Sequence, residues 1–177
     1  MLGLDPHSQD PEDLKKVEAA LMSIRPSISY FHQSKYVSDL ANGNICVAIG
    51  FSGDVLQAMT SAQQANNGVY LGYSIPREGS TVAVDMVVIP KAAPHLDAAY
   101  AYLNYLLDPQ VMAHISNAVK YPSGNAAALQ YVDPALRGNP AVYPPQEVLD
   151  TLFPIQTLSP AGMRLSTRLW TRVTSGR

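Results

Sequence analysis

The sequence predicts an α/β fold in which a mainly parallel sheet is followed by a helical segment. Apolar runs at residues 45–49, 69–75 and 82–89 read as strands, and an amphipathic segment between the first two reads as a helix. Strands that alternate with helices are typical of parallel sheets. From Pro94 onward the apolar residues follow helical spacing instead. With 47% hydrophobic and 15% charged residues, the 177-residue chain can build a core.

The first expected element is a helix over residues 10–24. Asp10 suits its N-cap and Pro11 its first helical position, and acidic residues follow in the first turn. Pro26 stops the helical pattern, because proline cannot continue a helix. A short strand is expected next, over residues 27–31.

The next stretch predicts a binding site. A short helix closes at Gly43, and the apolar run of residues 45–49 predicts a buried strand. Phe51 and Asp54 follow that strand at its carboxyl end, where open α/β sheets place their ligands. A second helix starts around Asp54 and ends near Asn66. Asp54 also fits a purely structural reading, because a carboxylate stabilises the positive end of a helix.

A second carboxylate lies within the third predicted strand. Asp85 is the only charge between residues 82 and 89, and Pro90 ends the run. A carboxylate in a buried strand is costly unless a cation or several donors satisfy it. We therefore expect Asp54 and Asp85 to form a pair that could hold a ligand ammonium group.

The rest of the chain predicts helices. Residues 96–107 have one apolar face, and Asp108 caps the next helix, over residues 109–119. Residues 121–145 are rich in proline and predict a wrapping loop with short turns. Residues 164–173 have an apolar stripe beside an arginine stripe, which indicates one packed face and one solvated face of a final helix.

Five strings of this sequence, in this order, resemble the periplasmic putrescine- and spermidine-binding proteins of polyamine ABC transporters. They are residues 36–54, 73–79, 103–109, 143–148 and 167–173. The resemblance covers only about the last half of a family member. It implies an incomplete α/β fold of the type II periplasmic binding protein class, made of the second lobe, a hinge strand and C-terminal helices. It divides the chain into a second-lobe segment, 1–79, and a hinge-return and helical segment, 80–177.

The resemblance also implies a ligand site. In the family, two lobes close on an extended diamine, acidic residues pair with its amino groups and aromatic rings cover its methylene chain. Phe51, Asp54, Asp85 and Tyr121 match such contacts, and each role is chemically sensible. One departure is Ala83, where the family usually has an aromatic residue. The implied function is binding without catalysis, metal or cofactor, in the periplasm, with a polyamine and an ABC permease as partners.

Two other readings stay open. Residues 50–54 nearly match the nucleophile elbow of serine hydrolases, with Ser52 as nucleophile, but Asp54 replaces the final glycine. The histidines are far apart, so no zinc pattern exists. Alternatively, the chain is a fragment that binds no ligand and forms a homodimer through apolar residues around 82–88, since uncovered strand edges and apolar patches seek partners.

Composition excludes further classes. The net charge of −2 provides no basic surface for nucleic acid, and no apolar run approaches the roughly 20 residues that span a membrane. The first residues lack the basic and apolar regions of a signal peptide, so we expect any leader of an exported parent to lie upstream. Cys46 reads as a small buried hydrophobe or as a cysteine whose partner lies outside this chain.

Overall fold

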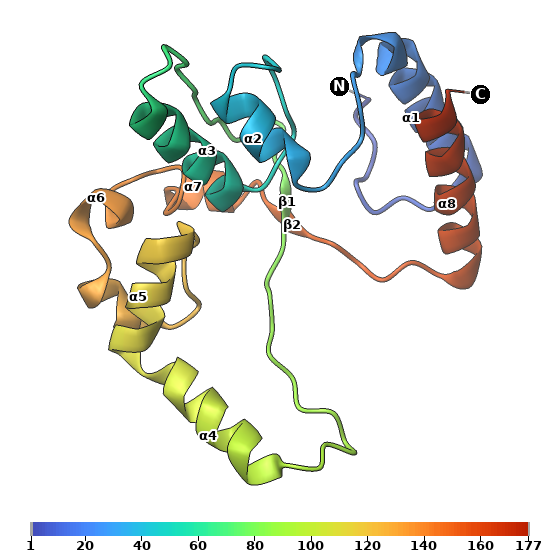
Figure 1. The fold of residues 1–177 in the computed structure, drawn as a ribbon. Coiled ribbons are helices and arrows are strands. Elements are labelled where there is room, and N and C mark those ends of the chain that lie inside the picture. The colour runs from blue at the N-terminus through green and yellow to red at the C-terminus, as the bar shows by residue number, and fades with distance from the viewer. Residues whose placement is uncertain (1, 177) are drawn as a thin grey trace. The chain divides into compact units, whose positions relative to one another are not determined.

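The computed structural model describes residues 2–176, and its helices and strands form two compact units (Figure 1). One unit contains residues 2–32, 81–83 and 153–176, and the other contains residues 33–80 and 84–152. The predicted division between residues 79 and 80 follows a different principle, the lobes of a longer protein, and it stays a prediction.

In the first unit, helix α1 (Pro11–Ile24) packs against helix α8 (Pro160–Ser175) (Figure 1). Asp10 caps α1 as predicted, since its carboxylate accepts the backbone N–H groups of Glu12 and Asp13. Ser159 caps α8 by accepting the N–H of Gly162. Within the predicted apolar stripe of α8, Leu169 and Val173 are buried. The arginine stripe is only partly free, because Arg172 pairs with Glu18 of α1.

The predicted strand at residues 27–31 is wrong. A short 3₁₀ helix, η1 (Arg25–Ser27), continues from α1, and residues 28–31 do not form a strand. Phe31 packs edge-on against Trp170 of α8, with ring centroids 5.1 Å apart, and the guanidinium of Arg25 lies 5.2 Å from the Phe31 ring. Phe31 is thus held by its ring contact with Trp170 and by the cation of Arg25, and not by strand pairing.

The predicted parallel sheet is also not formed among the described residues. Their only strands are β1 (Thr81–Val82) and β2 (Phe153–Pro154), which pair in parallel in the first unit. Residues 45–49, 69–75 and 83–89 are not strands. Val47 is 85% exposed and Ile49 fully exposed. The physical reason is that a strand needs a neighbour for its N–H and C=O groups, and apolar composition does not supply one.

The second unit has two cores, and the first lies around helices α2 (Lys35–Ala41) and α3 (Ser52–Ala65). Its buried members are Tyr36, Leu40, Ala41, Val55, Ala58 and Ala62. The predicted helix ends are confirmed, because Gly43 follows α2 with φ of 73° and Asn66 caps α3 in the left-handed region.

A second core in this unit lies around α5 (Pro109–Val119), with Leu56 of α3 also buried in it. The predicted cap Asp108 accepts the N–H groups of Gln110 and Val111, and α4 (Leu96–Leu107) precedes it. The predicted wrapping loop contains short turns, η2 (Ala126–Tyr131) and α6 (Pro134–Arg137), and is followed by α7 (Gln146–Leu149).

Within residues 2–176, every helix is too short or too polar to cross a bilayer.

Candidate functional site

The candidate site is centred on Asp54, in the first turn of α3. Its two carboxylate oxygens each accept a tyrosine hydroxyl. Tyr36 of α2 donates to Oδ2 at 2.7 Å, and Tyr121, which follows α5, donates to Oδ1 at 2.9 Å. The carboxylate is thereby fixed by residues 18 and 67 positions away in the chain. All three residues lie within the second unit.

Two glycines let the tyrosine rings approach the start of α3 closely. A Cβ on Gly50 would lie 2.4 Å from Cε2 of Tyr36, and a Cβ on Gly53 would lie 2.3 Å from Cε2 of Tyr121. Real Cβ atoms do not approach other atoms so closely, so any larger residue would displace these rings. The Gly-x-x-Gly spacing thus makes room for both phenols beside one carboxylate.

The phenols stay neutral over a wide pH range. Burial, the largest cause, and the hydrogen bond to Asp54 together raise the pKa of Tyr36 to about 12, and the bond from the Phe51 backbone partly opposes them. Burial also raises the pKa of Tyr121, and its hydrogen bond to Asp54 acts in the same direction. Both hydroxyls therefore remain proton donors to Asp54 at physiological pH.

Phe51 presents its ring to solvent immediately before α3. It is the N-cap residue of the helix and its side chain is 59% exposed. Its backbone N–H donates to the Tyr36 hydroxyl oxygen at 3.1 Å, while the ring is free to contact a ligand. The structure therefore links Phe51, Asp54 and Tyr121, three of the four predicted site residues, through hydrogen bonds to or around one carboxylate.

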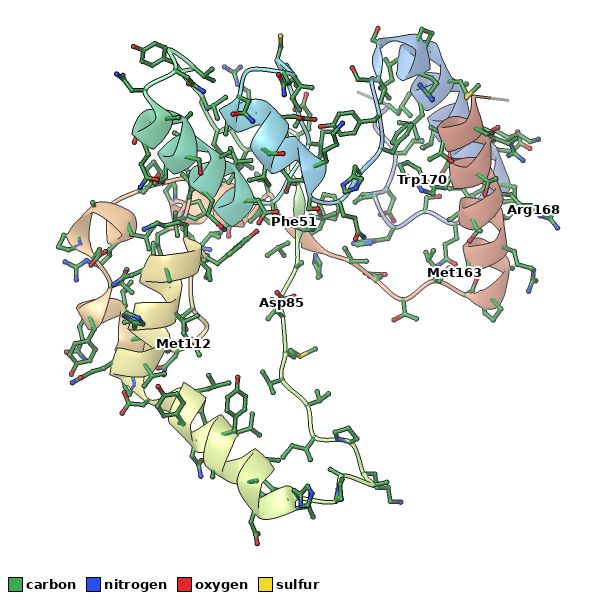
Figure 2. The ribbon with its side chains drawn as sticks, viewed as in Figure 1. Phe51, Asp85, Met112, Met163, Arg168 and Trp170 are labelled. Atoms are coloured by element: carbon green, nitrogen blue, oxygen red, sulfur yellow. The ribbon has the colours of Figure 1, made fainter. Side chains whose placement is uncertain are left out.

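Asp85 is placed differently from the prediction. It was expected inside a buried strand, but it is exposed and lies on the extended segment that leads to α4 (Figure 2). Val84 and Met86 beside it are 76% and 79% exposed. Nothing between residues 2 and 176 forms a hydrogen bond or ion pair with the Asp85 carboxylate. The expected desolvation of Asp85 is therefore absent, because no strand forms around it, and its role in a ligand site stays a prediction.

The structure also places Cys46, Ser52 and the residue types that bind metals. Cys46 is exposed, so the expectation of a buried hydrophobe is wrong. Ser52 is the first residue of α3, and the N-cap before it is Phe51, which makes no side-chain cap hydrogen bond. In the described part of the chain, no group of three or more His, Cys, Asp or Glu residues could hold a metal.

A separate cavity of about 650 Å³ lies elsewhere in the second unit. Its walls come from α3, residues 73–77, residues 139–141 and the α7 region. None of the four predicted site residues lines it. The Asp54 site is thus a polar cluster on the start of a helix, distinct from this largely apolar cavity.

Tyr36 is the residue of the candidate site that sequence reasoning missed. It heads the first string that resembles the polyamine-binding family, but no role was assigned to it. An aromatic residue on a helix normally indicates core packing. Only the fold shows that its hydroxyl reaches Asp54.

The chemistry of this arrangement suits a cation. Among residues 2–176 no Lys, Arg or His forms an ion pair with Asp54, and its carboxylate accepts hydrogen bonds from two neutral hydroxyl groups. Each carboxylate oxygen has a further lone-pair direction available, which an ammonium group can occupy. The exposed ring of Phe51 can attract a cation or cover methylene groups beside it.

Comparison with known proteins gives a family match. Residues 2–144 match the family described as Bacterial extracellular solute-binding protein. Putrescine-binding periplasmic protein SpuD of Pseudomonas aeruginosa (strain UCBPP-PA14) is 47% identical over 176 residues, which are 99% of this chain and 48% of that protein. Putrescine-binding periplasmic protein PotF of Escherichia coli (strain K12) is 46% identical over 177 residues, again 48% of that protein.

A more distant relative is named for two ligands. Spermidine/putrescine-binding periplasmic protein 1 of Haemophilus influenzae is 26% identical over 148 residues, which are 84% of this chain and 39% of that protein. The chain therefore spans about half the length of the putrescine-binding relatives that it matches.

Proposed function

This chain belongs to the bacterial extracellular solute-binding protein family, and we propose that it forms about half of a two-lobed protein that binds a polyamine. In this proposal the complete protein works in the periplasm and delivers putrescine or spermidine to an ABC permease. The names of the relatives support the ligand class and the compartment.

The observation that carries the proposal is the carboxylate of Asp54, held by two phenols and left without a cation. A charged group that accepts hydrogen bonds but has no counter-ion is well suited to a ligand ammonium group, because the pair forms only when the ligand arrives. Phe51 would cover the ligand's methylene groups, which are apolar and gain from leaving water.

A diamine needs a second anion at its other end, and we assign that role to Asp85. In the proposed type II binding protein, the extended segment around Asp85 acts as the hinge strand and gains its sheet neighbours from the part of the longer relatives that this chain does not span. That additional part of a longer protein would also supply the remaining wall of the site. Ala83, which replaces the usual aromatic residue, would leave that end of the ligand less covered.

We also propose that the protein is not an enzyme. The named relatives are binding proteins, and Ser52, the nucleophile of the hydrolase reading, has no histidine partner between residues 2 and 176. A serine-reactive probe should therefore leave Ser52 unlabelled.

Calorimetry with putrescine on the longest natural product that contains this chain tests the proposal. We expect tight binding, and we expect Asp54→Asn or Asp85→Asn to weaken it by about tenfold to a hundredfold, because each removes one charge-assisted bond. Asp97→Asn, a change in the first turn of α4, is the matched control and should leave affinity unchanged. Normal putrescine affinity in both site variants would contradict the assignment.

This chain by itself should bind putrescine far more weakly. A site that shares its contacts between two walls loses ion pairs and water exclusion when one wall is missing. Sub-micromolar binding by a monomer of this chain would show that it is a complete site.

A self-associating fragment without ligand is the second candidate function. The exposure of Val84, Met86, Val87 and Val88, each between 59% and 79%, favours it. Size-exclusion chromatography with and without putrescine separates the two candidates, because only a binding protein should change its elution volume when the ligand is added.

A further inference from the structure

We propose that Tyr36 is a positioning residue of the Asp54 site, whose hydroxyl joins the Asp54 carboxylate to the backbone of Phe51 and so sets the direction of both ligand contacts. The inference rests on the proposed polyamine site, but its first test needs no ligand.

The geometry around the Tyr36 oxygen carries the inference. The hydroxyl donates to Oδ2 of Asp54 at 2.7 Å and accepts the Phe51 N–H at 3.1 Å. The Tyr36 oxygen therefore bridges the backbone of Phe51, just before α3, and the carboxylate of Asp54, in the first turn of α3. The single hydroxyl proton goes to Asp54, and the oxygen still accepts the bond from Phe51.

The tyrosine itself is firmly held. Tyr36 is only 5% exposed and packs in the core of α2 and α3 with Leu40 and Val55. Its ring lies where a side chain on Gly50 would be, so that glycine and the ring fit together closely. A buried ring cannot turn away, so its hydroxyl points to a fixed place.

A second phenol completes the arrangement. Tyr121 donates to the other oxygen, Oδ1, and arises from the segment after α5. Two donors from two separate elements prevent rotation of the Asp54 carboxylate about its terminal bond. Among the described residues these two phenols are the titratable groups that the structure records against Asp54. The positioning thus depends on neutral donors, so the Asp54 carboxylate keeps its negative charge for a ligand ammonium group.

The first experiment compares three forms of this chain by NMR. Tyr36→Phe keeps the ring and removes the hydroxyl, so the Phe51 amide loses its acceptor and should exchange with solvent at least about fivefold faster. Tyr73→Phe is the matched control, since Tyr73 packs against the same core and has no recorded bond to Asp54 or Phe51. Equal Phe51 exchange in the Tyr36→Phe variant and the unmodified chain would overturn the proposal.

A measurement without substitution covers the case in which Tyr36→Phe does not fold. In the unmodified chain the Tyr36 hydroxyl proton should exchange slowly enough to be observed, with a cross-peak to the Phe51 amide proton. Absence of that cross-peak in a folded sample at low temperature would also overturn the proposal.

The second experiment measures putrescine affinity of the longest natural product that contains this chain. Tyr36→Phe should weaken binding by about tenfold with little change in melting temperature, whereas Tyr73→Phe should leave affinity unchanged. If the NMR result is as expected but no form binds a polyamine, the proposed function fails and the positioning stands. If binding is tight and Tyr36→Phe leaves it unchanged, the positioning role fails and the proposed function stands.

Discussion

At the scale of single residues, the site depends on contacts that only small residues permit. Asp54 lies between Tyr36 and Tyr121, and each ring occupies the space beside a glycine, Gly50 or Gly53. The polar geometry therefore depends on shape as much as on charge. Substitutions that add one carbon at these glycines should be more damaging than their size suggests.

Gly53→Ala should lower the free energy of unfolding by about 1 to 3 kcal/mol, because the new Cβ overlaps the Tyr121 ring. Alanine normally stabilises a helix relative to glycine, so a loss at this helical position would be due to the overlap. Gly124→Ala, where a Cβ meets nothing within 4 Å, is the control. Urea denaturation compares the two, and an equal or more stable Gly53→Ala protein would contradict the close fit.

Alkaline pH should unfold the chain partly through Tyr36. Its pKa rises from 10.0 to about 12 in the folded state, mainly because of burial, so the protonated form is favoured by folding. This stabilisation is fully present below pH 10 and is lost as pH rises toward 12. We expect the free energy of unfolding to decrease over that range, and to decrease less in Tyr36→Phe.

Denaturation curves at several pH values between 9 and 12 measure this alkaline effect, because in that range Tyr36 is protonated more in the folded state than in the unfolded state. Tyr70→Phe removes a phenol that is 95% exposed and serves as the control. If Tyr36→Phe shows the same alkaline loss as the control, burial of Tyr36 does not contribute.

At the scale of elements, the pairing of α1 and α8 depends on how the end of α8 is satisfied. The last carbonyl groups of a helix lack partners within it. Nε of Arg25 donates to the Val173 carbonyl at 2.9 Å, and Nη2 donates to the Thr174 carbonyl at 3.3 Å. The same guanidinium lies over the Phe31 ring. One arginine thus closes the end of α8 and joins it to the segment that follows α1.

Arg25→Lys should cost about 1 to 2 kcal/mol of stability, because one ammonium group cannot reach both carbonyls and cover the ring as a planar guanidinium does. Figure 2 shows Arg168 and Trp170 on different faces of α8, and the exposed Arg168 provides the control. Arg168→Lys should change stability by less than about 0.5 kcal/mol. Similar thermal melts for the two variants would show that the Arg25 contacts contribute little.

At the scale of the whole molecule, the chain exposes apolar side chains that larger assemblies normally cover. Ile49, Val84 and Val88 are 101%, 76% and 74% exposed, and each lies in a segment with the composition of a strand. The chain spans about half the length of the relatives it matches. The exposed segments are therefore expected to gain partners when the remaining part of such a protein is present.

This chain alone should self-associate as its concentration rises, because apolar segments without sheet neighbours pair with one another. Multi-angle light scattering should show a mass above that of the 19.1 kDa monomer at high concentration. Val84→Lys with Val87→Lys should reduce the association, whereas Ala19→Lys on the exposed side of α1 should not. A monomer at every concentration would contradict this expectation.

The sequence by itself determined the longer helices and several of their ends, because these depend on neighbours in the chain. Asp10 and Asp108 cap the expected helices, and Asn66 ends another. Its motifs also led to the family, and the resemblance led to Asp54 and Tyr121. Only the tertiary structure decided the rest. The predicted strands did not form, because a strand depends on partners that its own residues cannot specify. The role of Tyr36 was hidden, because its hydroxyl and the carboxylate of Asp54 lie 18 residues apart in sequence and meet only when α2 packs on α3.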